Sequence, residues 1–102
     1  MIDLIENHRA ELEELCRRFR VKTLEVFGSA ADGKFDPTRS DLDFLVEFFP
    51  MEPGPHSKAY FGLWFALQEL FRREVDLVEV LAIQNPYFLK AVNQSRQVLY
   101  AA

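Results

Sequence analysis

Apolar residues spaced three and four positions apart predict two amphipathic helices, over residues 4–19 and 58–71. His8 and Cys16 lie on the apolar stripe of the first helix. We interpret both as packing residues, because no second histidine or cysteine stands at a spacing typical of metal ligands. A third, short helix is predicted to begin at Asn85-Pro86, where a capping residue is followed by proline at the first helical position.

Shorter runs with alternating apolar and polar residues predict strands. We expect four of them, over residues 21–27, 41–49, 74–81 and 98–100. Together the helices and strands predict an α+β fold, a small mixed β-sheet with helices packed on one face.

The alternation in residues 41–49 assigns each side chain to a face of the sheet. The even positions are all apolar and are predicted to face the core: Leu42, Phe44, Val46 and Phe48. The odd positions therefore leave the sheet on the opposite side, and these include Asp41 and Asp43.

A turn of small residues follows the first predicted strand. That strand runs directly into Gly28-Ser29, and a loop rich in turn-forming residues, 30–40, leads to the second strand. Glycine lets the backbone approach a phosphate closely, and serine adds a hydroxyl and an amide donor. We expect Gly28, Ser29 and Ser40 to bind a nucleotide.

Three aspartates are candidate metal ligands and catalytic residues. Asp41 and Asp43 are two positions apart in a strand, so their Cα atoms lie about 7 Å apart and their oxygens can converge. Asp76 is the candidate third carboxylate; it stands among apolar residues of another strand, where burial is costly unless it is paired. Such a set can hold two Mg²⁺ ions together with phosphate oxygens and water. Asp76 could also deprotonate an acceptor hydroxyl.

The middle of the chain leaves alternatives open. Residues 50–57 hold three prolines and a glycine, which predicts a flap or a linker, with Ser57 capping the next helix and His56 exposed to solvent. Phe61 and Phe65 fall outside the apolar stripe of that helix. We expect the first helix or the proline-rich segment to cover them, and the alternative is a surface for another chain.

Composition narrows the classes of function. With 49% hydrophobic residues, the 102-residue chain is expected to form a single domain over residues 1–102. The net charge of -4 provides no general cationic surface, so we expect no direct binding of nucleic acid. The single cysteine, the lack of a signal-peptide pattern and the lack of a long apolar run predict a cytoplasmic protein without a membrane partner.

The ordered set of Gly28-Ser29, eleven loop residues, Asp41 and Asp43 with one residue between them, and Asp76 resembles the minimal nucleotidyltransferases (MNT) of the DNA polymerase beta superfamily. The similarity covers nearly the whole chain. It implies that Gly28 and Ser29 bind a triphosphate and that the three aspartates hold metal. ATP would be the substrate, with two Mg²⁺ ions as cofactors and Mn²⁺ as the alternative metal.

The resemblance also implies a partner. Family members of this size are typically encoded beside an all-helical HEPN protein as toxin–antitoxin pairs, and some transfer AMP from ATP to a tyrosine of the HEPN toxin. We therefore expect a metal-dependent nucleotidyltransferase that acts as an antitoxin by transferring AMP to a hydroxyl of its HEPN toxin. Homo-oligomers and hetero-oligomers both remain open.

Asp32 departs from the family pattern. The family often has arginine before the loop glycine, whereas Asp32 precedes Gly33 here and the loop is one residue longer; Lys34 and Arg39 are nearby basic residues. A second hypothesis is therefore a catalytically weak or inactive antitoxin that neutralises the toxin by binding. A third is transfer of a nucleotide to a small molecule of the aminoglycoside type, which would need an acceptor pocket built from a dimer.

Overall fold

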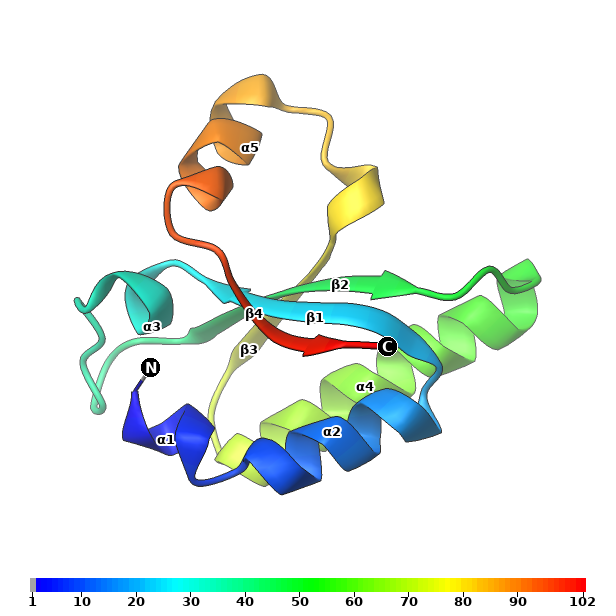
Figure 1. Ribbon diagram of the computed structural model, residues 1–102, viewed down its shortest axis with the longest axis horizontal. Helices are drawn as coiled ribbons and strands as arrows, with labels where there is room; N and C mark the ends of the chain where they lie inside the picture. The colour runs from blue at the N-terminus through cyan, green and yellow to red at the C-terminus, as the bar shows by residue number, and fades with distance from the viewer. Residues whose placement is uncertain (1) are drawn as a thin grey trace.

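A computed structural model of the protein describes residues 2–102. Its elements follow in the order α1 (Asp3–Glu6), α2 (Arg9–Arg18), β1 (Val21–Phe27), α3 (Ser29–Asp32), β2 (Leu42–Phe48), α4 (Pro53–Phe71), β3 (Val75–Glu79), the 3-10 helix η1 (Val80–Ala82), α5 (Pro86–Asn93) and β4 (Gln97–Ala101). Figure 1 shows the sheet across the middle of the molecule, with α2 and α4 below it and α5 above it.

The four predicted strands form one mixed sheet, as expected. The strand order is β3-β2-β1-β4. β1 is antiparallel to both of its neighbours, whereas β2 and β3 are parallel. A parallel pair needs a long crossover, and α4 provides it. β3 ends at Glu79, before the predicted end of the strand at residue 81, because the chain turns into η1 there.

The two faces of the sheet carry cores of different size, and the even positions of β2 face the main core, as predicted. The main core between the sheet and α2 and α4 contains all four even-numbered side chains of β2: Leu42, Phe44, Val46 and Phe48. On the opposite face, Leu45 packs with Phe27 of β1 and Val92 of α5 in a small cluster. The two long helices thus lie on one face, and α5 covers part of the other.

The continuous helix predicted over residues 4–19 is divided in two. His8 leaves the helical conformation, with φ -120° and ψ 18°, between α1 and α2. Its Nδ1 atom lies 2.9 Å from the carbonyl oxygen of Leu4, and its ring packs edge-on against Phe71 with centroids 5.3 Å apart. The break lets α1 change direction while Ile5 remains fully buried. His8 and Cys16 are packing residues, as predicted.

The proline-rich segment is not a flap or a linker, and this prediction was wrong. α4 begins at Pro53, with Glu52 rather than Ser57 at the N-cap position. Proline costs no hydrogen bond in a first turn, because the N–H groups there have no partner within the helix. The first i to i−4 bond runs from the His56 amide to the Glu52 carbonyl, at 2.9 Å.

His56 is half-buried, contrary to the expected exposure. Its Nε2 atom lies 2.5 Å from Oε1 of Glu79, and its ring packs edge-on against Phe48 at 5.3 Å. The pair connects the start of α4 to the end of β3.

Phe61 and Phe65 are not covered, so the preferred prediction for them was also wrong. They are 55% and 58% exposed. Each lies two residues from the buried Leu63, which places it about 200° around the helix from the core. α2 meets α4 instead at Gly62, where a Cβ atom would lie 2.5 Å from Cε1 of Phe19.

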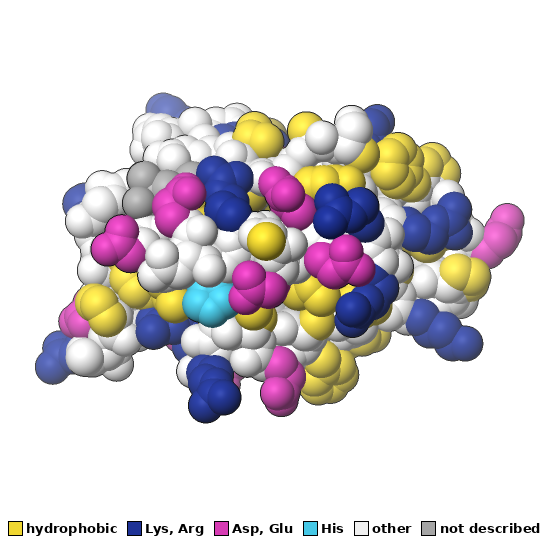
Figure 2. Space-filling model, turned by 60° about the horizontal axis from the view of Figure 1, so that its bottom comes forward, with side chains coloured by type: hydrophobic (Ala, Val, Ile, Leu, Met, Phe, Trp, Pro, Cys, Tyr) yellow, Lys and Arg dark blue, Asp and Glu magenta, His cyan; other side chains and the backbone are white. Residues whose placement is uncertain are grey.

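The surface over α1, α2 and α4 carries charges of both signs. Figure 2 shows acidic and basic side chains interspersed across this face, with apolar side chains visible between them. Within residues 2–102, no helix is long and apolar enough to span a bilayer.

Candidate active site

Asp43 and Asp76 lie side by side on neighbouring strands. They are direct partners in the parallel register of β2 and β3, so both side chains project from the same face, as predicted. Asp76 is exposed, so the expected cost of burying it does not arise. Asp41 is also exposed and stands immediately before the first residue of β2.

The three carboxylates interact electrostatically. Partial burial, a hydrogen bond with Asp76 and the negative charges of Asp76 and Asp41 raise the pKa of Asp43 to about 6. A carboxyl group that holds its proton this strongly has too few neighbouring cations or donors to stabilise its charge. Added positive charge at this position would favour the ionised form of Asp43.

Gly28 occupies a position that only glycine fits. Its φ of 71° and ψ of -148° lie in a region that L side chains rarely adopt, and a Cβ atom would lie 2.5 Å from Oδ2 of Asp43. The Gly28 carbonyl accepts hydrogen bonds from the amides of Ala31 and Asp32, both at 3.0 Å, which begins α3. The turn therefore places its backbone directly against a candidate metal ligand.

Ser29 and Ser40 occupy different surroundings. Ser29 is the half-buried first residue of α3, directly after Gly28. The Ser40 hydroxyl oxygen accepts a hydrogen bond from the Asp36 amide at 2.9 Å, and its carbonyl accepts one from Nη1 of Arg73 at 3.2 Å. Ser40 thus holds the end of the loop before Asp41, and its role in nucleotide binding stays a prediction.

Two residues at the site are absent from the sequence prediction. Ser95, in the turn after α5, accepts a hydrogen bond from the Gly28 amide on its Oγ at 3.0 Å. Arg73 lies over the ring of Phe35, 5.1 Å from its centroid, besides its bond to Ser40. Neither could be found from spacing, because each meets the site only through the packing of distant segments.

The donor set fits a divalent cation in its chemistry. Carboxylate oxygens are the ligands that Mg²⁺ and Mn²⁺ prefer, and the raised pKa of Asp43 indicates a site where a cation would be favourable. In the described chain, residues 2–102, no three His, Cys, Asp or Glu side chains already stand in an arrangement that could hold an ion. Asp43 and Asp76 already meet, so completing a site requires Asp41 to turn toward them.

The sequence model of the protein family described as "Nucleotidyltransferase domain" matches residues 9–99 of the chain. The chain belongs to this nucleotidyltransferase family. A relative from Methanocaldococcus jannaschii, named as a candidate protein adenylyltransferase, is 35% identical over 92 residues, which cover 90% of this chain and 87% of the relative.

Solved structures confirm the fold and the resemblance to minimal nucleotidyltransferases. A structure described as a candidate minimal nucleotidyltransferase has a TM-score of 0.73 and 31% identity, covering 94% of this chain and 95% of its own. A chain from a toxin–antitoxin with AMP-PNP has a TM-score of 0.69 and 20% identity, covering 92% and 73%. A chain from the complex of a tri-AMPylated Shewanella oneidensis HEPN toxin with an MNT antitoxin has a TM-score of 0.64 and 17% identity, covering 95% and 72%.

Proposed function

We propose that this nucleotidyltransferase is a metal-dependent protein adenylyltransferase that transfers AMP from ATP to a hydroxyl of a HEPN-type toxin, and so acts as an antitoxin. The observation that carries the proposal is the pairing of Asp43 with Asp76 directly beside the Gly28 turn. The name of the Methanocaldococcus relative and the AMPylated toxin in the Shewanella complex support the same reaction and acceptor.

The residues have distinct roles in this proposal. Asp41, Asp43 and Asp76 would hold the divalent cations, which neutralise the leaving pyrophosphate and polarise the α-phosphorus when bound. Gly28 and Ser29 would lie against the phosphates, because the missing Cβ of Gly28 permits close approach of the backbone.

The transfer step exchanges one bond to phosphorus for another. The acceptor hydroxyl oxygen bonds to the α-phosphorus, and the bond from that phosphorus to the pyrophosphate oxygen breaks. The hydroxyl proton passes to a carboxylate. Asp76 is the member of the Asp43–Asp76 pair that is exposed to an incoming acceptor, so we assign it this role.

The proposal is tested by incubating the protein with α-labelled ATP, Mg²⁺ and a HEPN protein encoded by a neighbouring gene. Wild type should label the HEPN protein, and Asp43→Asn, which keeps the side-chain shape, should reduce labelling by at least about 100-fold. Glu47→Gln is the matched control, because Glu47 is on the same face of β2 but pairs with Lys22 at 3.7 Å. Absence of labelling by wild type would contradict the proposal.

A second candidate is an antitoxin that neutralises the toxin by contact alone. The uncovered rings of Phe61 and Phe65 favour it, since neighbouring exposed aromatic side chains are typical of interaction surfaces. In this case Asp41→Asn and Asp43→Asn variants would still protect cells from the toxin, whereas Phe61→Ser with Phe65→Ser would not. Loss of protection in the folded aspartate variants would exclude it.

A further inference from the structure

Two aromatic side chains of α4 hydrogen-bond to the backbone of β3 on either side of Asp76. The Tyr60 hydroxyl donates to the Leu77 carbonyl at 2.5 Å, and Nε1 of Trp64 donates to the Val75 carbonyl at 2.9 Å. Both aromatic rings are partly buried. Asp76 is the residue between the two acceptors, so both bonds act on the backbone that carries this carboxylate.

The two acceptor carbonyls face the free edge of the sheet. β3 is the last strand in the order β3-β2-β1-β4, so it pairs with another strand along one edge only. On that paired edge, the Glu74 carbonyl accepts a hydrogen bond from the Leu42 amide of the β2 strand at 3.2 Å. Successive carbonyls of a strand point to alternate edges, so those of Val75 and Leu77 point outward. The phenol and indole groups supply donors where a further strand would otherwise do so.

The spacing of the two donors matches the spacing of the two acceptors. Tyr60 and Trp64 are four residues apart on α4, which corresponds to a rise of about 6 Å. The two carbonyls are two residues apart on β3, a rise of about 7 Å. Each donor therefore meets its own acceptor, and the pair of bonds fixes the position of β3 along α4.

The position of Asp76 depends on these bonds more than that of Asp43 does. Asp43 is in β2, which has a strand on each side, whereas Asp76 is exposed on the edge strand. A strand that is paired along one edge only moves more readily than an inner strand. The outer bonds of β3 therefore limit how far Asp76 can move away from Asp43.

We propose that Tyr60 and Trp64 are positioning residues for Asp76: their bonds to the outer carbonyls of β3 hold this carboxylate beside Asp43, as metal binding and transfer require. The inference rests on the proposed function, since it names residues that act on the reactive centre through the backbone of β3. Neither aromatic ring has a direct part in the chemistry.

The test uses Tyr60→Phe and Trp64→Phe, which keep an aromatic ring and remove the donor. Each variant should lower kcat for AMP transfer to a HEPN protein encoded by a neighbouring gene by about 10–100-fold, the usual cost of losing a group that orients a ligand. The KM for ATP should stay within about twofold, because the Gly28 turn is on β1 and α3. Mn²⁺ binding to the protein alone, followed by electron paramagnetic resonance, should weaken by about tenfold.

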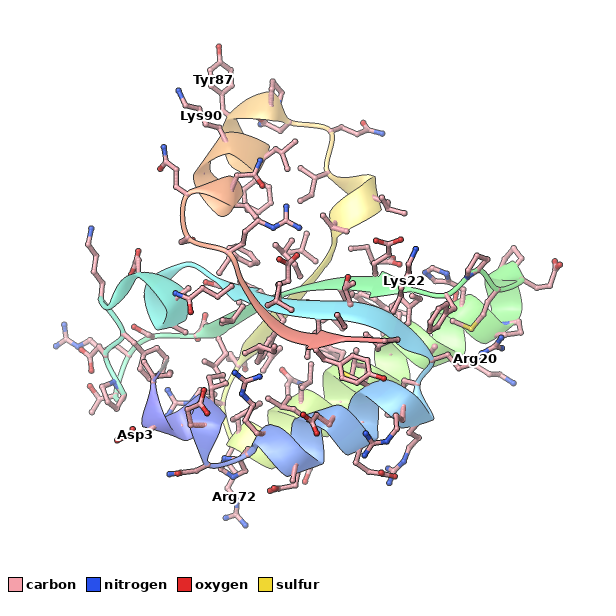
Figure 3. All side chains as sticks on the ribbon, in the orientation of Figure 1. Asp3, Arg20, Lys22, Arg72, Tyr87 and Lys90 are labelled. Atoms are coloured by element: carbon pink, nitrogen blue, oxygen red, sulfur yellow. The ribbon has the colours of Figure 1, made fainter. Side chains whose placement is uncertain are left out.

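Two variants serve as matched controls. Tyr87→Phe removes the same hydroxyl from a side chain that is 84% exposed and projects away from the sheet (Figure 3). His56→Ala loosens the same helix from the same strand, but His56 contacts β3 through the Glu79 side chain rather than through a backbone carbonyl. Both controls should keep the kcat and the Mn²⁺ affinity of wild type. Circular dichroism verifies that every variant is folded at the assay temperature.

A merely structural role would lower the melting temperature and leave the folded protein fully active. Folded Tyr60→Phe and Trp64→Phe with the kcat and Mn²⁺ affinity of wild type would therefore overturn the inference and leave the proposed function intact. Equal losses in His56→Ala would also overturn it, because general loosening of α4 would then explain the effect.

The two readouts separate this inference from the proposed function. If wild type transfers no AMP, the proposed function fails, whereas the Mn²⁺ titration still decides whether Tyr60 and Trp64 position Asp76. Failure of wild type to bind Mn²⁺ would refute both.

Discussion

The two faces of β2 have different roles: one packs in the main core, and the other carries candidate catalytic carboxylates. On the even face, every side chain from Leu42 to Phe48 is buried in the main core. On the odd face, Asp43 stands beside Asp76, and the pKa of Asp43 is raised by burial and by its acidic neighbours. The first face lowers the free energy of the folded state, whereas the second places like charges together at a cost.

This contrast teaches that the candidate site depends on the core for its geometry. Carboxylates that repel one another do not hold adjacent strands in register. The apolar side chains on the reverse of the same strands do so, because a slip by one residue would expose all of them to solvent. The predictions below separate the contributions of the two faces.

The largest effect is expected from Phe44→Ala. Phe44 is fully buried and stacks on Phe71, with ring centroids 5.9 Å apart. Truncation should lower the free energy of unfolding by about 3–5 kcal/mol, through lost apolar burial and the cavity that remains. Urea unfolding measures the change, with Glu47→Gln on the other face as a control that should shift it by less than about 0.5 kcal/mol. A loss below 1 kcal/mol for Phe44→Ala would contradict the assignment of this face to the core.

Gly28→Ala should lower both the stability of the fold and the transfer activity, because it strains the backbone and displaces Asp43. We expect a loss of about 2–3 kcal/mol in unfolding free energy together with a loss of transfer activity. Gly33→Ala is the matched control: its φ is also positive, at 83°, but no atom lies within 4 Å of the added Cβ. Equal losses in the two variants would show that contact with Asp43 adds nothing.

Asp43→Asn should stabilise the protein when a chelator has removed all metal. The folded-state pKa of about 6 exceeds the ordinary value of 3.8, so the stability that protonated Asp43 contributes is fully present below pH 4 and is lost as pH rises through 6. At pH 8 the neutral asparagine should be more stable by about 1 kcal/mol, after solvent screening of a half-exposed group. At pH 4 the two proteins should be similar, and urea unfolding at both pH values measures this.

Asp36→Asn should change the stability at pH 8 in the direction opposite to Asp43→Asn. Hydrogen bonds from the amide and hydroxyl of Thr38 lower the pKa of Asp36, so its charge stabilises the loop at neutral pH. This variant should be less stable than wild type at pH 8. If Asp43→Asn also lost stability there, the carboxylates would not be repelling one another.

The smallest effect on stability is expected from Phe65→Ser, within about 0.5 kcal/mol, because the ring is already 58% exposed. The same variant should weaken association with the HEPN protein if α4 contributes to the interface. Sedimentation or calorimetry with the purified pair measures the association. A large loss of stability would instead show that the ring packs within the chain in solution.

Much of the fold could be predicted from the sequence where one physical rule dominates. The alternation in β2 has a period of two, and it assigns Leu42, Phe44, Val46 and Phe48 together to the core face. Asn85 was correctly identified as a helix cap, since its Oδ1 accepts hydrogen bonds from the amides of Tyr87 and Phe88. The same alternation places Asp43 and Asp76 on one face of the sheet, given that β2 and β3 are neighbouring strands.

The errors arose where two rules compete. Proline breaks helices in general but is favoured in a first turn, so residues 50–57 predicted a loop although α4 begins within them. The helical spacing of apolar residues also continues across His8, so it predicted one helix. The structure has two helices, because His8 leaves the helical conformation. Contacts such as the bond from the Gly28 amide to Ser95 depend on how α5 packs on the sheet, which no local pattern encodes.

The parallel crossover from β2 through α4 to β3 has a consequence for recognising related sites in other chains. Only the short turn 72–74 separates the end of α4 from β3, and Val75 and Leu77 are buried on the core face of that strand. The short turn and the two buried side chains together keep Asp76 on the opposite face. Loop 33–41 lies on the surface, and it can change length while Gly28 and Asp43 stay in place. A search pattern for such sites should fix the spacing from the helix end to the last aspartate and leave the first gap variable.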